Sequence, residues 1–154
     1  MASMIRRRRN RWGSDRGSEL IEMAIVLPIL LMVIAGIMDF GFLFQRYEVV
    51  TNAAREGARL ASLPGYTTTD VQNRVNDYMA ASGLSPASSV AVTYATVAIG
   101  GTGPAVSMAN VIVEYPSEFT FIGSFAGMVG GSGWTGITLR AASSMRTEAP
   151  AAGS

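Results

Sequence analysis

The sequence predicts an α+β protein in which a long N-terminal transmembrane helix continues into a small domain of a second helix and a three- to four-stranded antiparallel sheet. Three observations lead to this prediction. An apolar run near the N-terminus is long enough to cross a bilayer, helical spacing continues beyond it, and the second half of the chain alternates with a period of two. With 154 residues, the chain has room for one modest domain and its appendages.

Residues 1–17 form a basic leader. It contains one acid, Asp15, and six arginines: Arg6, Arg7, Arg8, Arg9, Arg11 and Arg16. The leader therefore carries a net charge of +5 and the rest of the chain −4, within a total of +1. Arginines before an apolar helix place the N-terminus in the cytoplasm and the C-terminal domain outside it. An arginine cluster can also bind nucleic acid, but beside such a helix a topogenic and lipid-headgroup role is favoured, so we expect no nucleic-acid partner.

Residues 18–44 form the predicted transmembrane helix. From residue 23 to residue 44 the only charge is Asp39, and these 22 residues make a helix roughly 33 Å long, enough to cross the hydrocarbon core. Pro28 lies near the start of the helix, where a lost backbone bond is tolerated. A buried core helix is disfavoured because no other segment could surround it. A cleaved signal peptide is disfavoured because the run is long and no A-x-A-like site follows it.

Residues 45–63 continue the same helix, so that one helix runs from about Ser18 to Ser62 and stops at Pro64-Gly65. Helical spacing places five residues on one face: Tyr47, Val50, Ala54, Ala58 and Ala61. The small alanines on this face predict close packing against a sheet or a neighbouring helix.

Residues 64–146 form the predicted α+β domain. Its helix has the sequence TTTDVQNRVNDYMAASG, is capped by Thr68 or Thr69, and ends at Gly83. The residues expected to point inward are Val71, Val75 and Tyr78, whereas Asp70, Arg74 and Asp77 are expected on a solvated face.

Alternation with a period of two predicts the strands of this domain. It occurs at Val90, Val92 and Tyr94, at Val111, Val113 and Tyr115, and at Ile137, Leu139 and Ala141. GGTGP at residues 100–104 is expected to be a hairpin loop. For FIGSFAGMVGGSGW, residues 121–134, we favour a loop that covers the sheet over a short helix on the sheet or a partner surface. Residues 147–154 are expected to form a flexible tail.

Composition argues against an enzyme. The chain has no cysteine, no histidine and no lysine, which removes disulfides, thiolate metal sites, imidazole catalysis and Schiff-base chemistry. Glu114 and Glu118 flank Tyr115-Pro116, but nothing in the sequence marks them as a buried catalytic pair. We therefore expect no catalytic residues, no cofactor and no bound metal.

Two carboxylates lie in or beside the apolar run, where an unpaired charge costs several kcal/mol. Glu22 is close enough to the cytoplasmic surface to snorkel, or it pairs with another group. Asp39 lies in the last turns of the run. Snorkelling toward the outer surface is favoured for Asp39 over an ion pathway, and a partner on a second subunit is a third option.

The stretch RGSELIEMAIVLPILLMVIAGIMDFGFLF resembles the TadE-like family, the pseudopilins of tight-adherence type IV pilus systems. The resemblance rests on the G-x(4)-E step from Gly17 to Glu22, the spacing of Glu22, Ala24 and Pro28, and the later Asp-Phe-Gly at residues 39–41. It extends through NAAREGARLAS and returns in the terminal LRAASSMRTE. Met23 departs from the aromatic residue that related major pilins carry after the glutamate, which bears on the efficiency of processing.

The resemblance implies a pilin-like fold and a minor pilin or pseudopilin. A prepilin peptidase would cut after Gly17, Ser18 would become the N-terminus, and Glu22 would pair with the Ser18 ammonium of a neighbouring subunit. The implied partners are other pilin or pseudopilin subunits, an inner-membrane assembly platform and membrane lipid. The implied location is the bacterial inner membrane with a periplasmic domain, or the extracellular pilus. The alternative is an uncleaved single-pass binding or adhesion module.

Overall fold

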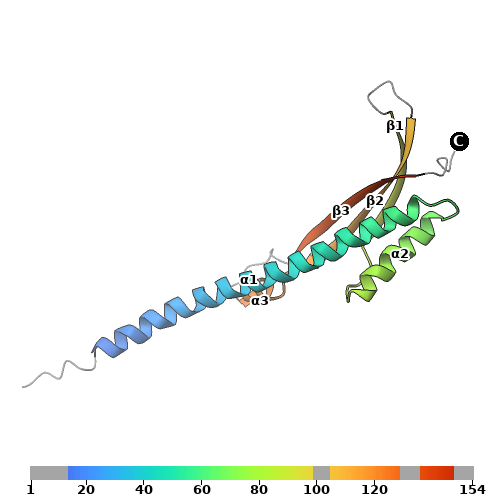
Figure 1. The fold of residues 1–154 in the computed structure, drawn as a ribbon. Helices are drawn as coiled ribbons and strands as arrows, with labels where there is room; N and C mark the ends of the chain where they lie inside the picture. Colours follow the sequence, from blue (N-terminus) through green and yellow to red (C-terminus); the bar gives the residue numbers. More distant parts are fainter. Residues whose placement is uncertain (1–13, 99–104, 129–135, 148–154) are drawn as a thin grey trace, which may run out of the picture.

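The structure is a computed structural model that describes residues 14–98, 105–128 and 136–147. Figure 1 shows a long helix that extends well beyond a small α+β domain at its C-terminal end. The order of elements along the chain is α1, α2, β1, β2, α3 and β3. This confirms the predicted combination of a long apolar helix, a second helix and an antiparallel sheet, which has three strands in the described part of the chain.

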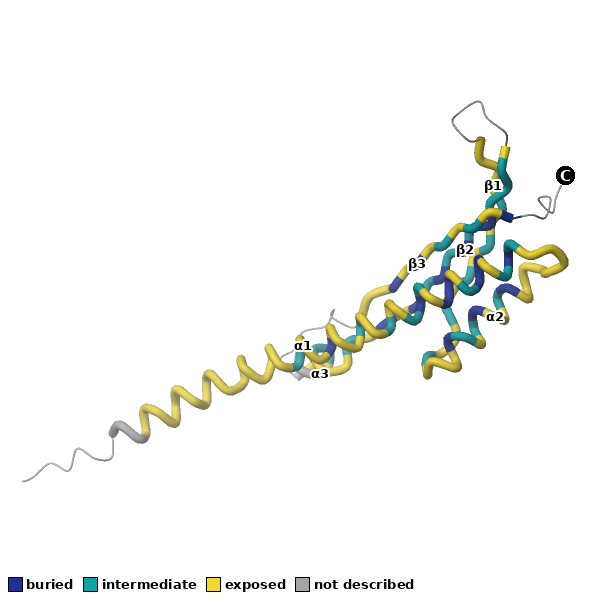
Figure 2. Tube along the Cα trace, viewed as in Figure 1, coloured by how far each residue is buried: buried dark blue, intermediate teal, exposed yellow. Residues whose placement is uncertain are grey.

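The helix α1, Ser14–Ala61, is continuous over 48 residues and is therefore about 72 Å long. Its two halves have different surroundings, as Figure 2 shows: the N-terminal half is exposed, and buried positions gather in the C-terminal half. The exposed half contains an 18-residue window with a mean hydropathy of 2.7, none of which the rest of the chain buries. A helix in a globular core would be largely covered, so this exposure favours a single-pass membrane anchor.

The C-terminal half of α1 packs on the domain mainly through small side chains. Those that are buried are Val50, Ala53, Ala54, Ala58 and Ala61. Tyr47, expected on this face, is instead 45% exposed. Arg46, the residue before Tyr47, instead contacts the end of β2 through hydrogen bonds.

Gly57 lies where α1 comes closest to its neighbours. A Cβ atom built at this position would be 2.7 Å from Val75 Cγ2 of α2 and 3.2 Å from Val111 Cγ1 of β2. The first distance is shorter than carbon atoms tolerate, so glycine allows the helix, its neighbour and the sheet to meet. Spacing alone had indicated the alanines of this face but not Gly57.

The helix α2, Thr68–Ala81, begins one residue after its N-cap, Thr67, rather than at a cap on Thr68 or Thr69. The Thr67 side chain accepts a hydrogen bond from Asp70 N, and Thr67 N donates to Asp70 Oδ2 at 2.8 Å. This is a capping box, and the bonds from the Thr67 hydroxyl and N–H lower the pKa of Asp70. The helix ends at the C-cap Ser82, and Gly83 follows with a φ of +78°.

Two predicted inward residues of α2, Val71 and Val75, are fully buried, but the third buried position is Met79. Tyr78 is only partly buried against the core. The core stripe of α2 thus steps by four residues twice, which places it against α1.

The sheet consists of β1, Ser89–Ala98, β2, Ala105–Glu118, and β3, Gly136–Arg146, in the order β1-β2-β3. Both pairings are antiparallel. The expected alternation is seen in β2, where Val111, Val113 and Tyr115 are buried. In β3, Leu139 and Ala141 are buried but Ile137 is 42% exposed. The predicted GGTGP hairpin loop lies outside the described residues. It falls between β1 and β2, whose pairing on the loop side ends with Ala98 opposite Ala105.

The prediction for residues 121–134 was wrong where the structure describes them. Residues Phe121–Met128 form a helix, α3, that lies beside α1 rather than a loop that covers the sheet (Figure 1). Residues 129–135 lie outside the described part. At the other end, Thr147 is buried, and its N–H donates to Ser107 O at 2.9 Å, so this residue is held by the sheet.

Candidate functional site

The predicted processing residues lie at the start of α1. Gly17 and Ser18 are exposed helical residues, and a Cβ atom built on Gly17 meets no atom within 4 Å. Its backbone φ is not positive either, so neither packing nor conformation within the described chain requires glycine here. Of the six topogenic arginines, five lie outside the described residues, and only the helical backbone of Arg16 is described.

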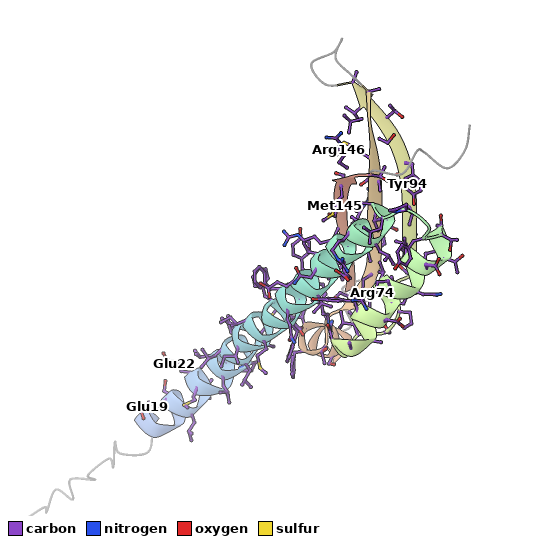
Figure 3. The ribbon with its side chains drawn as sticks, turned by 45° about the vertical axis from the view of Figure 1, so that its right-hand side comes forward. Glu19, Glu22, Arg74, Tyr94, Met145 and Arg146 are labelled. Atoms are coloured by element: carbon purple, nitrogen blue, oxygen red, sulfur yellow. The ribbon has the colours of Figure 1, made fainter. Side chains whose placement is uncertain are left out.

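Glu22 lies on an exposed face of the same end of α1, far from the domain, as Figure 3 shows together with Glu19. A shallow groove on this face is lined by Glu19, Glu22, Met23, Val26, Leu27 and Leu30. These positions recur every three or four residues, so they form one stripe of the helix. Among the residues whose side chains the structure describes, none forms a hydrogen bond or ion pair with Glu22.

Pro28 lies inside α1, which continues through it without interruption. Proline lacks the backbone N–H that would donate one helical hydrogen bond, and, as expected, the helix continues on both sides of it. The side chain is exposed like those around it.

Asp39 is only 3% exposed, and it does not snorkel. Its carboxylate accepts hydrogen bonds from three successive backbone amides at the start of α3. The distances are 2.9 Å from Thr120 N to Oδ1, 3.1 and 3.0 Å from Phe121 N to Oδ1 and Oδ2, and 2.6 Å from Ile122 N to Oδ2. A side chain of α1 therefore caps a helix more than 80 residues away in sequence, which satisfies both the carboxylate and the amides.

Arg46 holds the end of β2, which comes just before the residues that Asp39 binds. One guanidinium nitrogen, Nη1, donates to Ser117 Oγ and to Glu118 O, each at 2.9 Å. Asp39 and Arg46 are seven residues apart, which is two turns and places them on nearly the same face of α1. We call these two residues the α1 clamp, since together they fasten the connection from β2 to α3 along the helix.

Apolar contacts continue the attachment of α3. The rings of Phe42 and Phe121 are stacked, with centroids 6.4 Å apart and an angle of 20° between their planes. A Cβ atom built on Gly36 would lie 3.8 Å from Ile122 Cδ1, which is ordinary van der Waals distance. The helix α3 thus lies beside residues 36–42, within the stretch predicted to cross the membrane.

A second charged group links α1 to α2. Glu56 accepts hydrogen bonds from Arg59 Nε and Nη2, both at 3.0 Å, and from Arg74 Nε and Nη2 at 3.1 and 2.9 Å. The bonds from Arg59 and then those from Arg74 lower the pKa of Glu56 to about 2. Arg74, expected on a solvated face, is half exposed and is also paired (Figure 3 labels it).

Two further carboxylates among the described residues lie on β2. The described residues contain no group of three or more His, Cys, Asp or Glu that could hold a metal ion. Glu114 and Glu118 lie on the face of β2 away from the buried residues, and Glu114 is 3.6 Å from Arg140 on β3. Glu114 is partly exposed and Glu118 is exposed, so the two carboxylates do not make a buried acid–base pair.

These features define a class of protein: an α+β protein with one N-terminal apolar helix, half of it uncovered and half of it packed on a small domain. The family model described as TadE-like protein matches residues 17–59. This confirms the TadE-like resemblance over that part of α1, and the matched region includes Gly17, Glu22, Asp39 and Arg46. The terminal LRAASSMRTE lies outside the match.

The TadE-like match suggests a protein associated with Tad pili, in a family of pilus proteins rather than enzymes. It also suggests that other pilus components are partners. No curated protein and no solved structure was found to be similar to the chain.

Proposed function

We propose that this chain is a minor pilin or pseudopilin-like subunit that is processed after Gly17 and takes part in assembling a tight-adherence, type IVb-like pilus. In this proposal residues 18–44 bundle with the helices of other subunits in the inner membrane, and the domain lies in the periplasm. The partners are a prepilin peptidase, other pilins or pseudopilins, the assembly platform and membrane lipid.

One observation above all supports assembly: the N-terminal half of α1 is apolar, uncovered and bears a carboxylate without a described partner. A helix that served only as an anchor would gain nothing from Glu22 in its first turns, since an acid near hydrocarbon has to be paired or hydrated. The ammonium of Ser18 on a neighbouring subunit would pair with it. The groove that begins at Glu19 and Glu22 offers a place for a second helix to pack.

The position of Gly17 supports processing. Because a side chain at this position meets nothing in the described chain, the fold does not explain the glycine, and recognition by a peptidase does. The leader arginines support the orientation, since positive charge stays on the cytoplasmic side.

The first test is the intact mass and N-terminal sequence of the full chain purified from the membranes of its native host. A mature chain that begins at Ser18 is expected. A chain that keeps Arg6 to Arg16 would overturn the processing step and favour an uncleaved anchor for a binding or adhesion domain.

The matched variants are Gly17→Val and Gly41→Val, because a Cβ atom meets nothing within 4 Å at either position. Gly17→Val should block cleavage and leave the domain folded, whereas Gly41→Val should be cleaved normally. Normal cleavage of both variants would show that no peptidase reads Gly17.

A further inference from the structure

We propose that α3 is a membrane-embedded element: it lies in the outer leaflet at the boundary of headgroups and acyl chains, packed on α1, so that the domain is held against the bilayer at a second place. This proposal rests on the membrane-spanning role of α1. Its partner is the hydrocarbon of lipid, not a protein.

The depth of α3 follows from its place along α1. A hydrocarbon core about 30 Å thick takes about 20 helical residues, so a span that begins near Glu22 reaches the outer boundary near residue 42. The contacts of α3 are with Gly36, Asp39 and Phe42 of α1. The short helix therefore lies beside the last turns of the span and not above them.

The composition of α3 suits this depth. Its eight residues, FIGSFAGM, include no charge, and four of them are large and apolar. Phe121 remains 39% exposed despite its stacking on Phe42. The same level of α1 exposes aromatic rings, with Phe40 68%, Phe42 43% and Phe44 56% exposed. Phenylalanine is a common residue on the apolar face of helices that lie at the interface between lipid and water.

The hydrogen bonds of Asp39 complete the inference. The first amides of a helix lack partners within the helix, and in hydrocarbon no water can satisfy them. Asp39 accepts bonds from the amides of Thr120, Phe121 and Ile122. In the same contact the carboxylate, which would be costly alone at this depth, is satisfied. The carboxylate satisfies the amides and the amides satisfy the carboxylate, so neither brings an unpaired polar group into the lipid.

Site-directed fluorescence can test this placement, because the chain contains no cysteine and a single introduced one can be labelled uniquely. Gly127→Cys is the reporter: Gly127 is exposed, and a Cβ atom there meets nothing within 4 Å. Val26→Cys, on the uncovered part of α1, is the lipid control, and Asn73→Cys, exposed on α2, is the water control. The full-length chains would carry an environment-sensitive dye in phosphatidylcholine vesicles.

The label at Gly127 is expected to lose intensity with nitroxide-labelled lipid, as the label at Val26 does, and to resist aqueous iodide. If it behaves instead like the label at Asn73, the inference is overturned while the anchor stands. A label shielded from both quenchers would mean that protein covers α3, which also overturns it. If the label at Val26 is itself exposed to iodide, α1 does not span the bilayer, and both the anchor and this inference fall.

Discussion

Asp39 connects two segments of the molecule by accepting charge-assisted hydrogen bonds from three backbone amides, so its replacement has a defined effect. In Asp39→Asn one oxygen becomes an NH2 donor that faces the backbone amides. The free energy of local opening of α3 is expected to fall by roughly 2 kcal/mol or more. Amide hydrogen exchange at Thr120 to Ile122 would measure it.

The matched control for Asp39→Asn is Glu48→Gln, which changes an exposed acid of the same helix for which the described residues provide no hydrogen bond. Exchange in α3 should not change in this variant. Equal protection in all three proteins would contradict the capping role of Asp39.

Gly57 offers a second test at the scale of one residue. Alanine favours a helix by about 1 kcal/mol over glycine. At this position, however, its methyl group would lie 2.7 Å from Val75 Cγ2, and the resulting overpacking is expected to cost about 1–3 kcal/mol. Gly57→Ala should therefore lower the thermal unfolding midpoint of the detergent-solubilised protein, and Gly41→Ala, in open space, should not. An unchanged midpoint for Gly57→Ala would show that α1 and α2 move apart at little cost.

Sequence patterns could predict α1, α2 and the strands, but not α3 or the contacts that connect the elements. Hydropathy and spacing placed α1, and alternation placed the buried residues of β2, because both signals are local. The partners of Asp39 and Arg46 lie 71 to 83 residues away in sequence, so no spacing rule reaches them. The sequence did contain one signal. Asp39 is an acid within an apolar run, and FIGSFAGM is an uncharged apolar segment, so each of the two required a partner elsewhere in the structure.

The processing site and the pairing of Glu22 stay predictions. They depend on a peptidase and on neighbouring subunits, so the contacts within one chain do not test them. What the chain does provide is the uncovered stripe on which such a partner would pack.

At the scale of elements, the link between α1 and α2 depends on pH. The folded-state pKa of Glu56 is lowered to about 2, from the usual value of 4.5. Its contribution to the stability of the folded state is therefore fully present above about pH 4.5 and is lost as the pH falls toward 2. Both arginines are at least half exposed, so solvent screening keeps this contribution on the order of 1 kcal/mol.

Glu56→Gln should accordingly unfold at lower denaturant concentration than the parent protein at pH 7, and the difference should shrink as the pH falls from 4.5 through 2. The control is Asp77→Asn, an exposed acid of α2 for which the described residues provide no ion pair. A difference between Glu56→Gln and the parent that stayed constant from pH 7 to pH 2 would show that charge is not the cause.

At the scale of the whole molecule, Glu22 is expected to act between subunits and not within one. Glu22→Gln preserves the shape of the side chain but removes the charge that would pair with Ser18 of a neighbour. Membrane insertion and cleavage after Gly17 should stay normal, whereas the yield of assembled pili should fall by an order of magnitude or more if the pair sets the register of the bundle. Immunoblots of membrane and sheared-pilus fractions would measure both.

Glu19→Gln is the matched variant, because Glu19 lines the same groove one turn earlier but is not the fifth residue after the cleavage point. It should assemble normally. Equal loss in both variants would indicate a general need for negative charge on this stripe, and unchanged pili in Glu22→Gln would remove the pairing from the proposal.

The continuity of α1 has a mechanical consequence. The helix enters the domain without a hinge, and the α1 clamp fastens the end of β2 and the start of α3 to it. Gentle curvature only lengthens the backbone hydrogen bonds of such a rod, whereas a sharp bend would have to break some of them. A rotation or pull applied to the membrane end of α1 is therefore transmitted to the sheet as torque or tension in the same direction.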